Sequence, residues 1–217
     1  TSLKAHGVQD AVVYNGVARH VFRPMPRGEA RRLLGLPEYG KLLLCVASLV
    51  PIKGHFVLLQ AFQRLLQHHQ IEARLVLLGE GTLKNQLLQQ ANALKIAGHV
   101  KFAGGCHHSQ VPLWINASDT VCLASFNEGL PNVLVEALAC GRPVVSTRVG
   151  GIAELVTGDE YGRLVEAGDS SGMAAAMRDV LGRNWDVHAL TACPQVISWE
   201  ESSALLLAAL QRTCWRA

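Results

Sequence analysis

The sequence predicts an α/β fold in which a doubly wound parallel sheet is covered by helices on both faces. Short apolar runs alternate along the chain with longer amphipathic runs, which is the order of a repeated βαβ unit. The apolar runs are mostly continuous, which is typical of strands that are buried on both faces. With 217 residues, 49% of them hydrophobic, the chain can form one domain with a sizeable core and an appended segment.

The expected strands are the short apolar runs. They span residues 41–48, 73–79, 99–104, 119–125, 143–147 and 162–168. The longest apolar stretch, LLLCVASLVPI, is interrupted by Ser48 and Pro51, far short of the roughly 18–20 residues that cross a membrane. We therefore interpret it as a buried strand and its following loop.

The expected helices lie between these strands. After the first strand, apolar residues at positions 56, 59, 62, 65 and 66 have helical spacing. Further helices are predicted over 82–98, 110–118, 131–141, 150–158, 170–182 and 198–217. Thr82 and Ser170 are predicted N-caps, and Gly98 is a predicted stop. Segment 183–198 has weak periodicity and is interpreted as a connection.

Charge and cysteine content exclude some classes of protein. The net charge is +3, without the Lys/Arg cluster of a nucleic-acid-binding surface. The six cysteines are scattered, which favours a reducing compartment over a disulfide framework. Cys106, His107 and His108 are potential metal ligands, but no second group has matching spacing, so we expect no metal site.

Parallel sheets of this class bind ligands at the carboxyl ends of their strands. This rule selects the loops near residues 48–55, 79–82, 104–109, 125–132 and 147–152, where many of the glycines lie. In the loop after the strand 119–125, Glu128 precedes a helix start and Glu136 follows inside that helix. Two carboxylates that only accept hydrogen bonds suit a ligand with many hydroxyls. The alternative is that Glu128 merely faces the helix dipole and Glu136 is a surface residue.

Two other loops carry weaker signals. Lys53 follows the first strand, where its ammonium could bind a phosphate, or it could be an ordinary solvated lysine. Gly79 and Gly81 form a Gly-x-Gly turn that lacks the third glycine of a dinucleotide fingerprint.

Taken together, these segments resemble a known family. VASLVPIKGH, LVLLGEGTLKNQL, ASFNEGLPNVLVEALACGRPVVSTRVGGIAELV and GRLVEAGD follow the order and spacing of the nucleotide-binding half of retaining glycosyltransferases of family 4, also called glycosyl transferases group 1. The spacing of Glu128 and Glu136 matches the E-x7-E motif of that family, and VVYNGV at 12–17 resembles the segment after its inter-domain linker. The resemblance implies a Rossmann-like domain that is the C-terminal half of a GT-B fold.

The resemblance also implies site roles. Glu128 corresponds to the catalytic glutamate beside the donor sugar, Lys53 to the diphosphate-binding lysine and Glu136 to the ribose-binding glutamate. The remaining donor-binding positions are Ser48, Gly54, Gly79, Gly81, Phe102, Gly129, Leu130, Pro131, Asn132 and Val133. The family often has Gly-Arg where this chain has Ala47 and Ser48, so one phosphate-binding cation is missing, and Arg148 is a candidate substitute.

The implied organisation is the end of a linker over 1–20, the nucleotide-sugar-binding domain over 21–182, and a connection with a closing helix over 183–217. The N-terminal acceptor-binding domain of the family has no counterpart in these residues, so we expect weak nucleotide binding and little turnover from this chain alone. An uncovered Leu205–Leu210 face would favour self-association.

The expected substrate is a nucleotide diphosphate sugar, with no metal or other cofactor. The resemblance implies a cytoplasmic enzyme, with peripheral association to the inner membrane face as an option. Two alternatives remain at this stage: a nucleotide-sugar epimerase of the same fold, and a non-catalytic nucleotide-sugar-binding module.

Overall fold

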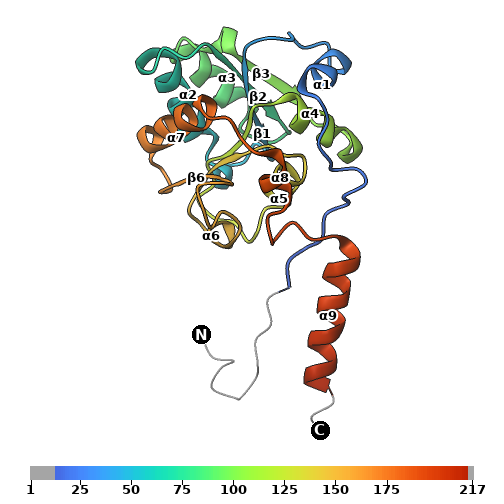
Figure 1. The fold of residues 1–217 in the computed structure, drawn as a ribbon. Helices are drawn as coiled ribbons and strands as arrows, with labels where there is room; N and C mark the ends of the chain where they lie inside the picture. The colour runs from blue at the N-terminus through green and yellow to red at the C-terminus, as the bar shows by residue number, and fades with distance from the viewer. Residues whose placement is uncertain (1–12, 215–217) are drawn as a thin grey trace.

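A six-stranded parallel sheet forms the centre of the computed structural model, which describes residues 13–214 (Figure 1). The strand order is β3-β2-β1-β4-β5-β6. The strands are β1 (Lys41–Val46), β2 (Ala73–Leu78), β3 (Val100–Gly104), β4 (Thr120–Leu123), β5 (Val144–Thr147) and β6 (Gly162–Val165). The predicted doubly wound parallel sheet is confirmed, with every predicted strand present in slightly shorter form.

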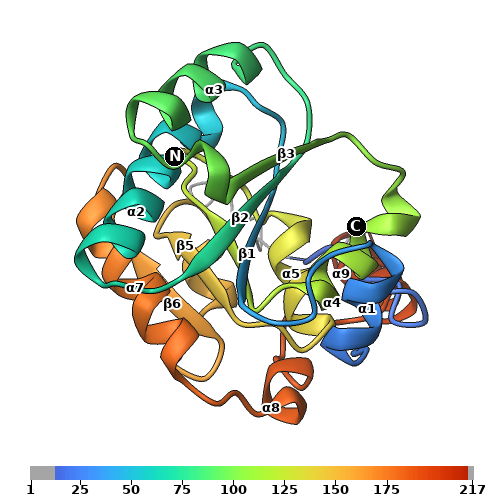
Figure 2. The ribbon, with the colours of Figure 1, turned by 90° about the horizontal axis from the view of Figure 1, so that it is seen from above.

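Helices cover both faces of this sheet (Figure 2). The longer elements are α1 (Arg27–Leu33), α2 (His55–His68), α3 (Lys84–Ala93), α4 (Val111–Ala117), α5 (Asn132–Ala139), α7 (Ser170–Gly182) and α9 (Trp199–Cys214). The short ones are η2 (Pro51–Lys53), η3 (Ala97–His99), η4 (His108–Gln110), α6 (Ile152–Leu155) and α8 (Val187–Thr191). Helices α2, α3 and α7 pack together on one face, while α1, α4, α5 and α8 pack together on the other.

The hydrophobic core lies between the sheet and these two helix layers. Leu43 and Leu44 in β1 are fully buried, as are Leu59 and Phe62 on α2. The helical spacing predicted for α2 is therefore correct, except that Phe56 at its start remains 37% exposed. Leu58, which the spacing did not include, is fully buried instead.

Three predicted helix boundaries are wrong. Helix α3 begins at Lys84 with Leu83 as N-cap, so Thr82 does not cap it. The same helix ends at Ala93, because Lys95 adopts a left-handed conformation with φ of 58° well before Gly98. Helix α7 is capped by the carboxylate of Asp169, which accepts a hydrogen bond of 2.8 Å from Gly172 N, while Ser170 is the first helical residue.

Helices α1 and α8 were not predicted from the sequence. Helix α1 has the sequence RGEARRL, which contains no apolar stripe, and the two residues that it buries are Ala30 and Arg31. Helix α8 has five residues and lies inside the segment interpreted as a connection. Both are held by packing, against α4 and α5 respectively, so local periodicity could not reveal them.

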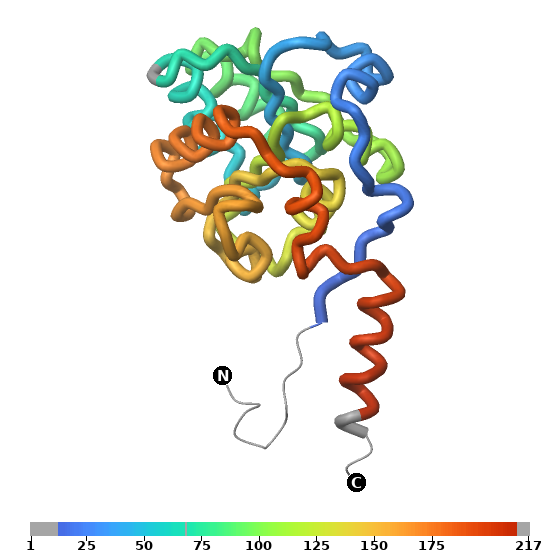
Figure 3. Tube along the Cα trace, in the orientation of Figure 1, coloured from blue at the N-terminus to red at the C-terminus, as the bar shows by residue number. Residues whose placement is uncertain are grey.

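The first described residues run beside the start of α9 (Figure 3). Val17 N donates a hydrogen bond of 2.8 Å to Ile197 O, and Ser202 Oγ donates one of 2.6 Å to Tyr14 O. Beyond this crossing α9 extends away from the sheet and its helices. Residues 1–12 of the predicted linker lie outside the described residues. Within residues 13–214, no helix is both long and apolar enough to cross a membrane.

Candidate functional site

The loops at the carboxyl edge of the sheet are joined by backbone contacts. Phe126 N, after β4, donates a hydrogen bond of 2.8 Å to Ile52 O, after β1. Gly54 has φ of 64° and lies so close to β4 that a side-chain carbon there would be 1.9 Å from Ala124 O. Only glycine fits this position. The close approach brings the β1 loop, with Lys53, against the loop that carries Glu128.

Lys53 and Glu128 meet at this edge. Lys53 Nζ donates a hydrogen bond of 2.7 Å to Glu128 Oε1, and Ser125 Oγ donates another of 2.7 Å to the same oxygen. The Glu128 side chain is only 10% exposed, so it is not a solvated loop residue. Thr147 Oγ1 in turn donates to Ser125 O at 2.6 Å, which ties the arrangement to β5. Lys53 is likewise held in place rather than freely solvated.

Glu136 is buried inside α5, with 8% of the residue exposed. The alternative that it is a surface residue is therefore wrong. Its Oε1 lies 3.0 Å from His108 Nε2, and the His108 ring packs on Phe22 with ring centroids 5.2 Å apart. Burial raises the pKa of Glu136, while the hydrogen bond from His108 acts in the opposite direction.

The turn between the two glutamates lies at the start of α5. Gly129 is exposed, and a side-chain carbon built there would meet no described atom within 4 Å. Pro131 is the N-cap of α5 rather than its first helical residue. Leu130 and Val133 are half-buried, and Asn132 accepts a hydrogen bond of 3.2 Å from Asn15 of the linker segment. The open backbone N–H groups of a helix start favour negative charge here.

Other predicted positions lie around this turn with different contacts. A side-chain carbon at Gly79 would be 2.1 Å from Ala47 O, and one at Gly81 would be 2.4 Å from Leu49 O. These two glycines therefore seat one loop against another. Ser48 is exposed in the β1 loop and Phe102 is half-buried in β3. Arg148, the candidate substitute cation, is 55% exposed and faces Glu166 at 3.8 Å.

A small cavity of about 80 Å³ adjoins Glu136. Its walls also include His108, Asn132 and linker residues such as Asn15, whereas Glu128 is not among its lining residues. The structure thus brings Lys53 to Glu128 and His108 to Glu136. The 129–132 turn, in which Gly129 and Asn132 are exposed, lies between the two glutamates in the chain.

Sequence reasoning missed several contributors. Ser125 and Thr147 are polar residues at strand ends, and their position at the carboxyl edge was the available signal. His108 was considered only as a potential metal ligand, but its ring contacts Glu136. His107 is the N-cap of η4, and its ring accepts a hydrogen bond from Ser109 N. Among residues 13–214, no group of three or more His, Cys, Asp or Glu side chains could hold a metal ion.

A buried histidine lies beneath the Lys53 loop. His55 is 1% exposed, and its Nε2 lies 3.8 Å from Cys45 Sγ. Its Nδ1 has no hydrogen-bond partner among the described residues. Burial and the nearby Lys53 charge lower the pKa of His55 from 6.5 to about 4, so the ring is neutral at pH 7.

Comparison with known sequences identifies related proteins. A model of the family described as glycosyl transferases group 1 matches residues 26–190. The chain is 33% identical over 178 residues to a D-inositol 3-phosphate glycosyltransferase of Thermobispora bispora, covering 78% of this chain and 42% of that protein. It is 32% identical over 162 residues to an N-acetyl-α-D-glucosaminyl L-malate synthase of Bacillus anthracis, covering 75% and 42% respectively. The chain spans about two fifths of the length of these curated relatives.

Solved structures with the same fold can be superposed on nearly the whole chain. The Anabaena protein HepE in complex with UDP-glucose superposes with a TM-score of 0.72 and 25% identity, covering 94% of this chain and 56% of that one. The C-terminal domain of a glycosyl transferase group 1 family protein from Francisella tularensis superposes with a TM-score of 0.68 and 24% identity. That match covers 89% of this chain and 97% of the Francisella domain.

Proposed function

Because this chain belongs to the glycosyl transferases group 1 family, we propose that it is the donor-binding half of a retaining family 4 enzyme with a GT-B fold. In this proposal the complete enzyme moves a sugar from a nucleotide diphosphate sugar to a hydroxyl acceptor. A second, acceptor-binding domain completes the active site, so the 217 residues alone bind nucleotide weakly and turn over little. The enzyme acts in the cytoplasm.

The observation that carries this proposal is the pair of mostly buried carboxylates on either side of one turn, which exposes Gly129 and Asn132. Glu128 and Glu136 have side chains that are each 10% exposed, and the 129–132 turn lies between them in the chain. Burying a charged carboxylate costs free energy unless hydrogen bonds and opposite charges compensate it. A ligand with hydroxyl groups at both ends and negative charge in the middle matches this arrangement.

Each residue then has a role. Glu128 faces the donor sugar and Glu136 accepts hydrogen bonds from the ribose hydroxyls. Lys53 gives one of its three N–H donors to Glu128, so two remain for the diphosphate. The backbone of Gly129 to Val133 approaches the sugar and diphosphate, and Ser48, Gly54, Gly79, Gly81 and Phe102 border the nucleotide.

Departure of the nucleoside diphosphate creates negative charge at the carboxyl edge of the sheet. Lys53 and the N-terminal end of α5 stabilise that charge without rearrangement, which is electrostatic catalysis by preorganised groups. Ser125 fixes Glu128 and His108 fixes Glu136, so both carboxylates keep their orientation while the donor reacts. The proposed reaction uses no metal ion.

Calorimetric titration of the chain with UDP, GDP, ADP and TDP tests the proposal. UDP comes first, because HepE was solved in complex with UDP-glucose. We expect one nucleotide to bind, and Lys53→Ala to weaken it about tenfold or more, since a hydrogen bond to a charged group contributes about 1.5–3 kcal/mol. Arg178→Ala on the exposed side of α7 is the matched control and leaves binding unchanged. Failure of all four nucleotides to bind would contradict the proposal.

The catalytic role of Glu128 needs the two-domain enzyme. Glu128→Gln keeps the size of the side chain but removes its charge, and we expect transfer to fall by about 10²–10³-fold. Unchanged transfer would instead favour a non-catalytic nucleotide-sugar-binding module. Incubation of the enzyme with the donor alone tests the remaining alternative, a nucleotide-sugar epimerase. An epimerase would isomerise the donor sugar without an acceptor, whereas a transferase would not.

A further inference from the structure

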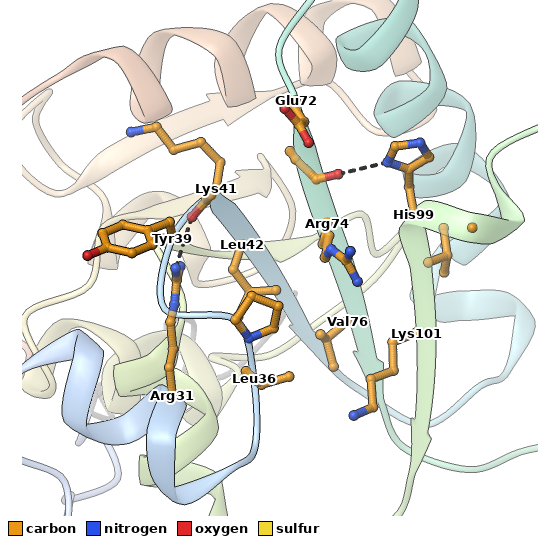
Figure 4. Close-up of a pocket in the computed structure, with 15 residues that line it drawn as sticks. Arg31, Leu36, Tyr39, Lys41, Leu42, Glu72, Arg74, Val76, His99 and Lys101 are labelled. Atoms are coloured by element: carbon orange, nitrogen blue, oxygen red, sulfur yellow. Dashed lines mark hydrogen bonds between the residues drawn. The ribbon is translucent and has the colours of Figure 1, made fainter.

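A second cavity lies at the opposite, amino edge of the sheet (Figure 4). Its volume is about 450 Å³, within the range of about 300–1,000 Å³ that is usual for small-molecule sites. The loop between α1 and β1 forms one side, with Leu36 and Tyr39, and strands β2 and β3 form the other. This edge is remote from the loops that carry Lys53 and Glu128, since those follow the carboxyl ends of the strands.

The strand register places apolar and cationic side chains on one face of the sheet inside this cavity. Leu42 in β1 is paired with Arg74 in β2, and Val76 in β2 is paired with Lys101 in β3. Register partners in a parallel sheet point to the same face, and so do residues two apart in one strand. Leu42 and Val76 are buried, at 6% and 1% exposure, and form the floor. Arg74 and Lys101 are exposed beside them.

The positive charge in the cavity exceeds the negative charge. Its walls include the cationic residues Arg31, Lys41, Arg74 and Lys101 and the imidazole of His99, against the acidic Glu72. Three of these side chains already have partners. Arg31 Nη2 lies 3.0 Å from Asp119 Oδ2, and Lys41 Nζ donates to Leu181 O at 2.9 Å. His99 Nδ1 lies 3.3 Å from Ala73 O. Lys101 Nζ lies 5.6 Å from the Trp114 ring centroid, with no acidic partner among the described residues.

Arg74 is available in the same way. Within residues 13–214 its guanidinium forms no ion pair. Glu72, which directly precedes β2, also lines the cavity. A guanidinium and an ammonium on neighbouring strands can bind one phosphate or carboxylate together, the guanidinium through two parallel hydrogen bonds. Tyr39, which is 86% exposed, supplies an aromatic ring at the rim.

We propose that this cavity is a binding site for a small organic anion, in which a phosphate or carboxylate is carried on a flat apolar body. The anionic group binds Arg74 and Lys101. The apolar body covers Leu42 and Val76 and reaches the Leu36 and Tyr39 side. The site is separate from the proposed donor site and does not depend on the proposed function.

Titration of the 217-residue chain with the fluorescent probe 1-naphthyl phosphate tests this proposal. We expect binding to weaken by about tenfold or more in the double variant Arg74→Gln with Lys101→Gln, because two charge-assisted hydrogen-bond donors are lost. Tyr39→Ala weakens binding about threefold, through loss of an aromatic contact. Both basic residues are exposed, so the double variant should fold, and its circular dichroism spectrum checks that it does.

Two controls locate the probe. Lys53→Ala at the other edge of the sheet leaves probe binding unchanged, and so does Arg178→Gln on α7. If binding is lost in Lys53→Ala but kept in the double variant, the probe occupies the donor site and the proposal is wrong. Equal affinity of the double variant and the original chain would overturn it as well.

A third comparison uses only the original chain. 1-Naphthoate shares the anionic group and should bind, while neutral 1-naphthol should bind about tenfold more weakly than the phosphate because it cannot pair with the two cations. If 1-naphthol binds as tightly as 1-naphthyl phosphate, the cavity does not select an anion and the proposal fails.

Discussion

Asp119 at the amino edge of the sheet and Glu136 at the carboxyl edge are carboxylates of nearly equal exposure, with 8% and 10% of their side chains accessible. Their partners differ. Asp119 Oδ2 accepts from Arg31 Nη2 at 3.0 Å and from Leu42 N at 2.8 Å, and Arg27 pairs with its other oxygen. Glu136 has the ring of His108, which is itself 69% exposed.

The difference separates a structural acid from one that is available to a ligand. An ionised carboxylate has about four lone-pair sites for hydrogen bonds. Protein groups bind both oxygens of Asp119, whereas Glu136 keeps acceptor capacity after its contact with His108. Burial alone therefore does not distinguish these two carboxylates, while their sets of hydrogen-bond partners do.

Asp119→Ala should have the largest effect on stability. It would leave Arg31, only 2% exposed, buried without its counter-charge, and breaking a buried ion pair in this way costs about 3–5 kcal/mol. Urea denaturation measures the loss, and Asp119→Asn, which keeps an acceptor for Leu42 N, should cost less. A loss below about 1 kcal/mol would show that Asp119 is not the structural acid of the comparison.

The buried base His55 should make the stability of the fold depend on pH. Its folded pKa of about 4 lies below its ordinary 6.5, so the folded chain binds fewer protons than the unfolded chain between these values. Stability from this group is complete above pH 6.5 and is lost as the pH falls towards 4, by on the order of 3 kcal/mol.

Urea denaturation at pH 7, 5.5 and 4 measures this loss. The matched variant His55→Phe retains a flat ring without a titrating group, so its stability should fall less over the same interval. Parallel pH profiles for the two proteins would show that His55 does not control the acid response.

Glu136→Gln should have a smaller effect, which differs between stability and nucleotide binding. Because burial raises the pKa of Glu136, the folded chain binds more protons than the unfolded chain, and ionised Glu136 opposes stability as the pH rises through this window. The neutral amide should thus leave the melting temperature at pH 7 unchanged or higher, while weakening nucleotide binding about tenfold through loss of a charged acceptor. Loss of both stability and binding would place Glu136 with Asp119 as a structural acid.

The pH dependence of nucleotide binding tests the same residue. Affinity for the nucleotide should decline as the pH falls and Glu136 gains a proton, beginning at a higher pH than for an ordinary glutamate. Glu136→Gln should lack this part of the decline. Calorimetric titrations between pH 7.5 and 5 give both profiles.

Helix α9 offers the weakest expected effect. Leu205, Leu206 and Leu207 are 50–58% exposed, although they are consecutive and point to different sides of the helix. We expect weak, concentration-dependent self-association that Leu205→Glu with Leu206→Glu removes, with Ser203→Glu on the same helix as the control. Light scattering measures it, and a monomer at the highest concentration would contradict the expectation.

Much of the fold was predictable because continuous apolar runs such as LLLCV in β1 can be satisfied only when both faces of a strand are covered. Helix α1 was not, since it buries only Ala30 and Arg31, and the ion-pair partner of Arg31, Asp119, lies 88 positions away. The capping errors at Thr82 and Ser170 are shifts of one residue, which is the usual uncertainty of a helix boundary.

By itself, the sequence determined the parallel sheet and the loops that gather at its carboxyl edge, because strand periodicity and glycine placement are local properties of the chain. Only the tertiary structure decided which charged groups meet. Lys53 reaches Glu128 across 75 positions and His108 reaches Glu136 across 28, and Arg74 and Lys101 share a cavity through strand register. Electrostatic energies depend on distance in space and on burial, and neither quantity can be read from spacing along the chain.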